Sequence, residues 1–235
     1  GTVSAPGTSD LLDAAVRAGA DLIGGLAPAG FDQDVKGHLD IVFGIAERHG
    51  VPVDIHLHDP DALGLMEIED IANRTRALGM QGRVAVSHAY CLGQVPEASV
   101  RKAASTLADA GVAIMTNAPG NHAFPPVLPL RAAGVTVFAG NDNIRDSWWP
   151  YGDADMLERA MIVGYRSGFY TDEDLVAAFD LATGAAARAF GLKEHGLEVG
   201  RSADFVVVDA RHVPEAVVAR PPRKACYKRG RLVAQ

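Results

Sequence analysis

The sequence predicts an α/β fold, in which helices cover a sheet of parallel strands, followed by a small antiparallel sheet. From residue 9 to about residue 140, an amphipathic helix, a glycine break and a short run rich in valine and isoleucine follow one another repeatedly. These runs are almost continuously apolar, as is typical of parallel strands buried on both faces. Near the C-terminus, two short runs are separated by Arg229 and Gly230, which favours an antiparallel hairpin.

Five pairs of a helix and a strand account for the repeated part. Apolar residues at helical spacing predict helices, the first of them with Ser9 as its N-cap. The predicted helices span residues 9–18, 35–48, 61–78, 100–110 and 128–133. The predicted strands that follow them span residues 20–25, 51–57, 83–87, 112–116 and 135–139. Parallel neighbours require crossover connections, and these helices provide them.

The pattern changes after residue 150. Three helices are expected at residues 154–167, 172–181 and 183–190, the second of them capped by Thr171. Strands of a small sheet are expected at residues 203–209, 224–227 and 231–234. We therefore expect one domain over residues 1–195 and a second over residues 196–235.

Composition narrows the class of protein. With 235 residues, 48% of them hydrophobic and 22% charged, the chain is typical of a globular domain. The net charge of −7 and the absence of a basic stripe argue against a nucleic-acid partner. No apolar run approaches the roughly 20 residues of a membrane span, and the start of the chain lacks signal-peptide features. We expect a cytoplasmic enzyme with no membrane partner, and the sequence is compatible with a homo-oligomer.

Polar side chains follow the predicted strands at the point where each strand ends. Carboxyl ends of parallel strands meet at one edge of a sheet, so these groups are expected to lie close together. Strand alternation places His56 and His58 on one face, although the Asp59-Pro60 pair puts His58 at the start of a loop. Imidazole and carboxylate groups suit zinc, iron or manganese. The residues concerned are His56, His58, Asp59, Ser87, His88, Thr116, Asn117, Asn141, Asp142 and Asn143.

Plainer interpretations compete with this one. A single strand-end histidine such as His56 is more often structural, and only its combination with His88 and Asp142 favours a metal site. His58 is expected either to support the ligands or to face solvent. Five other histidines are interpreted as surface or capping residues, and a cluster of four acidic residues as the solvated face of a helix. These are His38, His49, His122, His195 and His212, and the acidic cluster Asp61, Glu67, Glu69 and Asp70. For His122, which lies in the loop after the fourth predicted strand, contact with a ligand is an alternative.

Three segments, VDIHLHD (53–59), VAVSHAY (84–90) and FAGNDNIRDSWWPYGDADML (138–157), resemble the amidohydrolase superfamily, specifically its cytosine deaminase-like branch. The likeness extends to GLEVGRSADFVVVDA (196–210) and KRGRLV (228–233). The resemblance implies strands four to eight of a (β/α)8 TIM-type barrel, followed by part of a small β-sandwich.

The resemblance also implies roles for individual residues. His56 corresponds to a metal ligand, and Asp142 to a ligand that also accepts the proton of the attacking water. His88 corresponds to the histidine that orients this water. Asp59 stands where the branch has a proton-carrying glutamate, one methylene longer.

Two more positions correspond to substrate-binding residues of the branch. Asn143 stands where a second acid is common, and as an amide it can hydrogen-bond but cannot exchange protons. Trp148 matches a tryptophan that lines the substrate pocket, although a buried loop anchor beside Trp149 is an alternative role. Both differences from the branch favour a substrate other than cytosine itself.

The reaction implied is hydrolytic deamination of a cytosine-like N-heterocycle by water that one divalent zinc or iron ion activates. Hydrolysis of a cyclic amide or imide is an alternative, and a catalytically inert α/β binding or scaffold domain is another. The His-x-His motif of the family's first strand is absent before residue 20. We therefore expect that the chain is the C-terminal part of a longer enzyme and that it folds poorly and is inactive without the missing strands.

Overall fold

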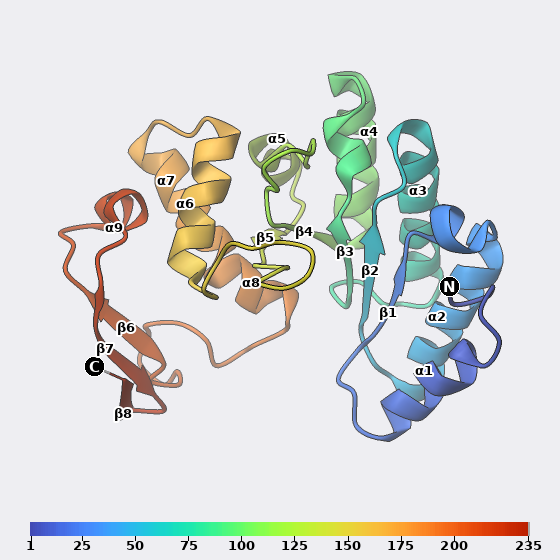
Figure 1. Ribbon diagram of the computed structural model, residues 1–235, viewed down its shortest axis with the longest axis horizontal. Helices are drawn as coiled ribbons and strands as arrows, with labels where there is room; N and C mark the ends of the chain where they lie inside the picture. The colour runs from blue at the N-terminus through green and yellow to red at the C-terminus, as the bar shows by residue number, and fades with distance from the viewer. Residues whose placement is uncertain (235) are drawn as a thin grey trace. The chain divides into compact units, whose positions relative to one another are not determined.

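The computed structural model describes residues 1–234 and divides into two compact units, Gly1–Val137 and Phe138–Gln235. The centre of the first unit is a parallel sheet (Figure 1). Its strands lie in chain order, as the sequence predicts, with Ile55 of one strand paired with Val86 of the next. The strands are β1 (Ile23–Leu26), β2 (Val53–Leu57), β3 (Val84–His88), β4 (Val112–Thr116) and β5 (Val137–Ala139).

Helices join consecutive strands in the first unit and lie beside them (Figure 1). This repeated arrangement of strand and helix is that of consecutive units of a (β/α)8 barrel. The helices are α1 (Thr8–Arg17), α2 (Val35–His49), α3 (Asp61–Ala77), α4 (Glu97–Ala110) and α5 (Val127–Ala132). Two short helical turns, η1 (Pro28–Asp32) and η2 (Tyr90–Gly93), also occur, and the sequence pattern did not predict them.

Helices α2 and α4 end at the glycines that the sequence indicates, whereas the start of α1 differs from the prediction. Gly50 and Gly111, with φ of 68° and 60°, end α2 and α4 in the left-handed conformation that glycine adopts at low cost. The prediction that Ser9 caps α1 is wrong. The helix begins one residue earlier, after Gly7 at φ 82°, so Ser9 lies inside it.

Alternation along β2 determines which side chains face the helices. Val53, Ile55 and Leu57 are buried, whereas Asp54 and His56 between them are only half-buried. The apolar set packs on the helical side, so Asp54 and His56 share the opposite face of the sheet. This alternation leaves the second-last residue of the strand, His56, free to take part in a site at the carboxyl end.

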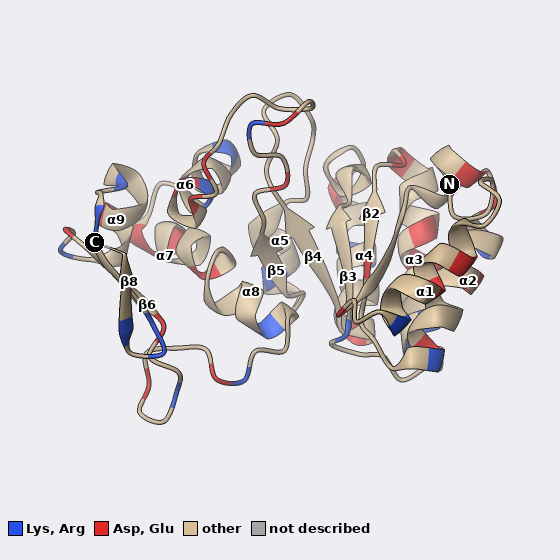
Figure 2. Cartoon of the chain, turned by 60° about the horizontal axis from the view of Figure 1, so that its bottom comes forward, with Lys and Arg blue, Asp and Glu red and all other residues tan. Residues whose placement is uncertain are grey.

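Acidic and basic residues both occur along the helices of the first unit (Figure 2). Asp13 of α1 binds Arg48 of α2 at 3.0 Å, and Arg74 of α3 binds Asp40 of α2 at 2.7 Å. Each of these pairs is partly exposed, so it contributes at most about 1 kcal/mol. The apolar contacts, rather than these pairs, therefore hold the helices in place.

Two predictions of solvent exposure are wrong. His38 is fully buried, and its Nδ1 lies 2.7 Å from Asp32 Oδ2. Glu67, expected on a solvated face of α3, is also fully buried. In both cases the partner is distant in sequence or lies in the unpredicted turn η1, so helical periodicity alone could not reveal it.

We expect the substitution Gly64→Ala to destabilise the protein by about 1–3 kcal/mol. A Cβ at this position of α3 would collide with the backbone oxygen of Asp59 and approach Cys91 Sγ at 2.8 Å. Gly44→Ala in α2 is the matched control, because its Cβ would meet only Arg48 Nη1, at 3.6 Å. The control should gain roughly 0.5–1 kcal/mol from helix propensity. Urea unfolding of both variants checks the contrast, and a stabilised Gly64→Ala variant would contradict it.

The second unit contains helices and a small antiparallel sheet of order β6-β7-β8. Thr171 caps α7 in a reciprocal capping box with Asp174, which confirms its predicted role. Arg229 and Gly230, at φ 49° and 73°, form the predicted turn between the last two strands. The elements are α6 (Met156–Ser167), α7 (Asp172–Leu181), α8 (Gly184–Ala189), β6 (Phe205–Val208), α9 (Val213–Ala219), β7 (Arg223–Lys228) and β8 (Arg231–Ala234).

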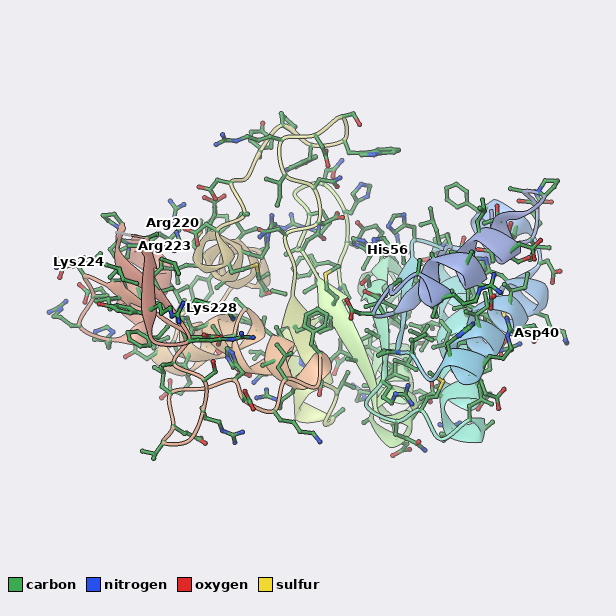
Figure 3. The ribbon with its side chains drawn as sticks, turned by 90° about the horizontal axis from the view of Figure 1, so that it is seen from below. Asp40, His56, Arg220, Arg223, Lys224 and Lys228 are labelled. Atoms are coloured by element: carbon green, nitrogen blue, oxygen red, sulfur yellow. The ribbon has the colours of Figure 1, made fainter. Side chains whose placement is uncertain are left out.

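Helix α9 was not predicted, although the predicted capping role of His212 is confirmed. His212 Nδ1 accepts a hydrogen bond from the Glu215 N–H at the start of this helix. Basic side chains near the small sheet bind acids of the same unit (Figure 3), among them Arg220 with Glu158 at 3.2 Å. The further pairs are Arg223 with Asp155, Lys224 with Asp209, and Lys228 with Asp204.

The expected domain boundary between residues 195 and 196 stays a prediction. Within residues 1–234, no helix has both the length and the apolar character that crossing a membrane requires.

Candidate active site

His56, which is labelled in Figure 3, lies at the carboxyl end of β2. Its ring centroid is 4.7 Å from that of His88, in an edge-to-face arrangement. The strand register explains this contact, because His56 pairs with Ser87 and the following Leu57 pairs with His88. The structure therefore brings together two histidines that the sequence places 32 residues apart.

His88 ends β3 in an unusual backbone conformation. Its φ is 71° and that of Ala89 is 44°, so two consecutive non-glycine residues occupy the left-handed region. Such conformations cost roughly 1–3 kcal/mol each and concentrate at functional sites. The bend brings the Tyr90 hydroxyl to 3.3 Å from His88 Nδ1.

The imidazole of His88 is neutral near pH 7. Burial, together with the nearby His56 and His58, lowers its pKa to about 3. The side chain is 1% exposed. A neutral ring can bind a metal or hydrogen-bond to water, but it supplies no positive charge.

His58 lies just beyond the end of β2, as its position before Asp59-Pro60 suggested, and is exposed. Its ring stacks on Tyr90 at 5.1 Å and contacts the ring of His88 at 4.7 Å. The exposed His122 also stacks on Tyr90, with ring centroids 5.3 Å apart. Aromatic rings thus extend from His56 across this edge of the first unit.

Asp59 differs from its histidine neighbours, because its side chain is only 5% exposed. One carboxyl oxygen faces Gly30, where a Cβ would lie 2.6 Å from it. The carboxyl group lies near Glu67 of α3, and its charge contributes to raising the pKa of Glu67. Sequence interpretation missed Glu67, although its spacing from Gly64 and Ile71 placed it on the buried face of the helix.

Asp54 and Ser87 lie deeper on the same strands. Ser87 Oγ donates a hydrogen bond of 2.7 Å to Asp54 Oδ1. Burial raises the pKa of Asp54, while this hydrogen bond acts in the opposite direction. At the end of β4, the fully buried Thr116 accepts a bond from the Ala118 N–H, and Asn117 is buried beside it.

Asp142 belongs to the second unit and follows β5 by three residues. It is exposed and has a left-handed φ of 61°. The buried Arg159 of α6 holds the preceding residue, since its Nη2 donates to the Asn141 oxygen at 3.2 Å. Asn141 in turn donates to Met156 Sδ at 3.1 Å. Sequence interpretation missed Arg159, which lies four residues before Val163 on the buried face of α6.

Asn143 and Trp148 lie in the loop that follows. Asn143 Nδ2 donates to Asp146 Oδ2 at 2.8 Å. Asp146 Oδ1 accepts hydrogen bonds from the N–H groups of Trp148 and Trp149. Trp148 is 82% exposed, so the alternative of a buried anchor does not hold.

The donor groups fit a divalent metal ion. In the first unit, His56 and His88 each offer an imidazole nitrogen, and in the second unit Asp142 offers a carboxylate oxygen. Two imidazole nitrogens and a carboxylate oxygen are ligands that catalytic zinc and non-haem iron sites use. The neutral state of His88 agrees with this role, because an imidazole must be unprotonated to bind a metal.

Comparison with known proteins gives a consistent result. The sequence model of the amidohydrolase family matches residues 1–234. N-isopropylammelide isopropyl amidohydrolase of Pseudomonas sp. (strain ADP) is 33% identical over 229 residues, which cover 97% of this chain and 57% of that protein.

Two crystal structures are similar to the chain. N-isopropylammelide isopropylaminohydrolase from Burkholderia multivorans is 47% identical, with a TM-score of 0.96 over 98% of this chain and 59% of that one. The 5-methylcytosine deaminase from Klebsiella pneumoniae, liganded with phosphonocytosine, is 26% identical, with a TM-score of 0.87 over 99% and 60%. The chain thus spans a little over half the length of these proteins.

Proposed function

The chain belongs to the amidohydrolase family, and from this premise we propose that the protein hydrolyses a C–N bond between a nitrogen heterocycle and an exocyclic amino or alkylamino group. The observation that carries the proposal is the contact of His56 with His88 at the carboxyl ends of β2 and β3, with ring centroids 4.7 Å apart. The similar proteins act, by their names, on isopropylammelide and on 5-methylcytosine. Both are small N-heterocycles, and we propose a substrate of this class.

We propose that His56 and Asp142 hold one zinc or iron ion. Such an ion, when bound, activates water for attack near neutral pH. The chemistry of the donor groups supports this role, because imidazole nitrogen and carboxylate oxygen suit both metals. His88 is the third donor group, and its burial keeps it neutral and able to orient water through a hydrogen bond.

Protons move through two carboxyl groups in this proposal. Asp142 accepts the proton of the attacking water, and Asp59 carries a proton to the ring nitrogen and the departing amine. Asn143 and Trp148 bind the heterocycle. The exposed indole of Trp148 offers a flat apolar surface, and its backbone is held by Asp146.

Product analysis tests the proposal. The full-length protein, loaded with zinc or iron, should release ammonia or an alkylamine from cytosine-like and alkylamino heterocycles and leave the ring intact. Mass spectrometry distinguishes this result from ring opening, which would point to a cyclic amide or imide substrate instead. A metal-free protein that is inert toward all these compounds would contradict the proposal and favour a binding domain.

The remaining expectations stay predictions. They are a cytoplasmic location, the lack of nucleic-acid and membrane partners, and a homo-oligomeric state.

A further inference from the structure

Two carboxyl groups lie together in the interior of the first unit. Asp59 follows β2 and is 5% exposed, and Glu67 of α3 is fully buried. The helix presents Glu67 on the same face as Gly64 and Ile71. Two buried acids in contact cannot both be ionised without a large electrostatic cost.

A hydrogen bond within this pair requires a proton. Glu67 Oε1 accepts a bond of 2.9 Å from the Ala29 N–H of η1, and Asp59 Oδ1 lies against the adjacent Gly30. Glu67 Oε2 and Asp59 Oδ2 are buried, and neither has a hydrogen-bond partner among residues 1–234. Two carboxylates are both acceptors, so a bond between them forms only when one of them carries a proton.

The surroundings favour this protonated state. Burial and, to a lesser extent, the charge of Asp59 raise the pKa of Glu67 to about 8, although the Ala29 N–H acts in the opposite direction. Cys91 of η2 is the other titratable group that faces the pair, and burial raises the pKa of its thiol to about 12. Since Cys91 stays neutral, the pair exchanges its proton without competition from the thiol.

We propose that Glu67 is a positioning residue, which shares one proton with Asp59 and keeps that carboxyl group fixed at the end of β2. The inference rests on the proposed function, in which Asp59 gives its proton to the leaving nitrogen. That proton forms a new N–H bond. Asp142 later releases to solvent the proton it took from the attacking water, and Asp59 takes one up, so the protons balance over one turnover. The Ala29 N–H stabilises the negative charge that the pair carries in between.

The pH dependence of kcat in the full-length enzyme tests this role with Glu67→Gln. In the parent, kcat should fall above about pH 8, where the pair loses its proton. The glutamine can still accept from Ala29 and donate to Asp59, but it cannot hold the shared proton. The decline of kcat should then begin at a lower pH than in the parent, with KM nearly unchanged. Glu69→Gln, an exposed acid on the same helix, should keep the parent profile.

If the role of Glu67 were only structural, Glu67→Gln would lower the fraction of folded, active enzyme equally at every pH. An unchanged profile in Glu67→Gln would therefore overturn the proposal.

Urea unfolding at several pH values tests the shared proton without any substrate. A carboxyl group whose pKa rises from 4.5 to about 8 on folding stabilises the protein fully at low pH, and this stabilisation is lost as the pH rises through that interval. Stability of the parent should thus decline between these values, and Glu67→Gln should flatten the decline. Asp59→Asn removes the same shared proton and should flatten it as well.

The two measurements separate the possible failures. An inactive parent whose stability shows the decline would contradict the proposed function alone. A slope that is the same in the parent and in both variants would overturn the shared proton. A flattened slope with an unshifted kcat profile would overturn the positioning role.

Discussion

Replacing Asp142 with asparagine is expected to reduce kcat of the full-length enzyme by about 10²–10⁴-fold or more. An amide cannot accept the proton of the attacking water, and it is a weaker ligand than a carboxylate for the metal ion of the proposed function. Steady-state kinetics on the substrate found by product analysis, together with metal content by elemental analysis, measures both effects.

The control for this prediction is Asp109→Asn. Asp109 is exposed on α4, so the same chemical change should leave both kcat and metal content near the parent values. Retained turnover in Asp142→Asn would remove Asp142 from the mechanism, even if the metal content fell.

Replacing Asp32 with alanine is expected to destabilise the protein by about 3–5 kcal/mol, because the buried His38 then loses the carboxylate that pairs with it. Asp32 accepts hydrogen bonds from the N–H groups of Thr2 and Ser4 at 2.8 and 2.9 Å, and its Oδ2 lies 2.7 Å from His38 Nδ1. The Asp32 and His38 side chains are 0% and 1% exposed. Urea unfolding of the full-length protein gives the change in free energy.

Asp40→Ala is the matched control. Asp40 binds Lys36 and Arg74, but 46% of its side chain is exposed, so its loss should cost no more than about 1 kcal/mol. If Asp32→Ala and Asp40→Ala lowered the free energy of unfolding equally, the burial of Asp32 would not explain its contribution.

The stability that Asp32 provides should depend on pH in a definite direction. Burial alone would raise its pKa, but hydrogen bonds from Ser4 and other groups outweigh this effect and hold the pKa well below its usual value. A carboxyl group whose pKa is lowered on folding stabilises the protein above its unfolded pKa, and the stabilisation is lost as the pH falls below about 4. Asp32→Ala should lose this acid sensitivity.

Strand order and most helices followed from the sequence because their signals are local. A buried run such as Val53–Leu57 and a terminal glycine such as Gly50 need no knowledge of distant residues. The proximity of His56 and His88 followed from the same local signals, since parallel strands end at one edge.

The errors concern residues whose partners are remote. His38 has the polar surroundings of a surface residue in sequence, and only the fold brings Asp32 and the first residues of the chain around it. Glu67 is buried because η1 supplies the Ala29 N–H, and the composition of η1 gives no helical signal. Arg159 likewise acquires its role only when Asn141 lies next to it.

The close approach of backbone to Asp59 at Gly30 affects how relatives of this protein should be compared. Gly30 leaves space for one Asp59 oxygen, which a side chain at position 30 would occupy. Substitutions that shorten side chains, such as alanine scanning, cannot reveal that the absence of a side chain at position 30 makes room for Asp59. An orthologue with a bulkier residue there must have moved or lost the acid, so position 30 is an indicator of whether a homologous chain retains it.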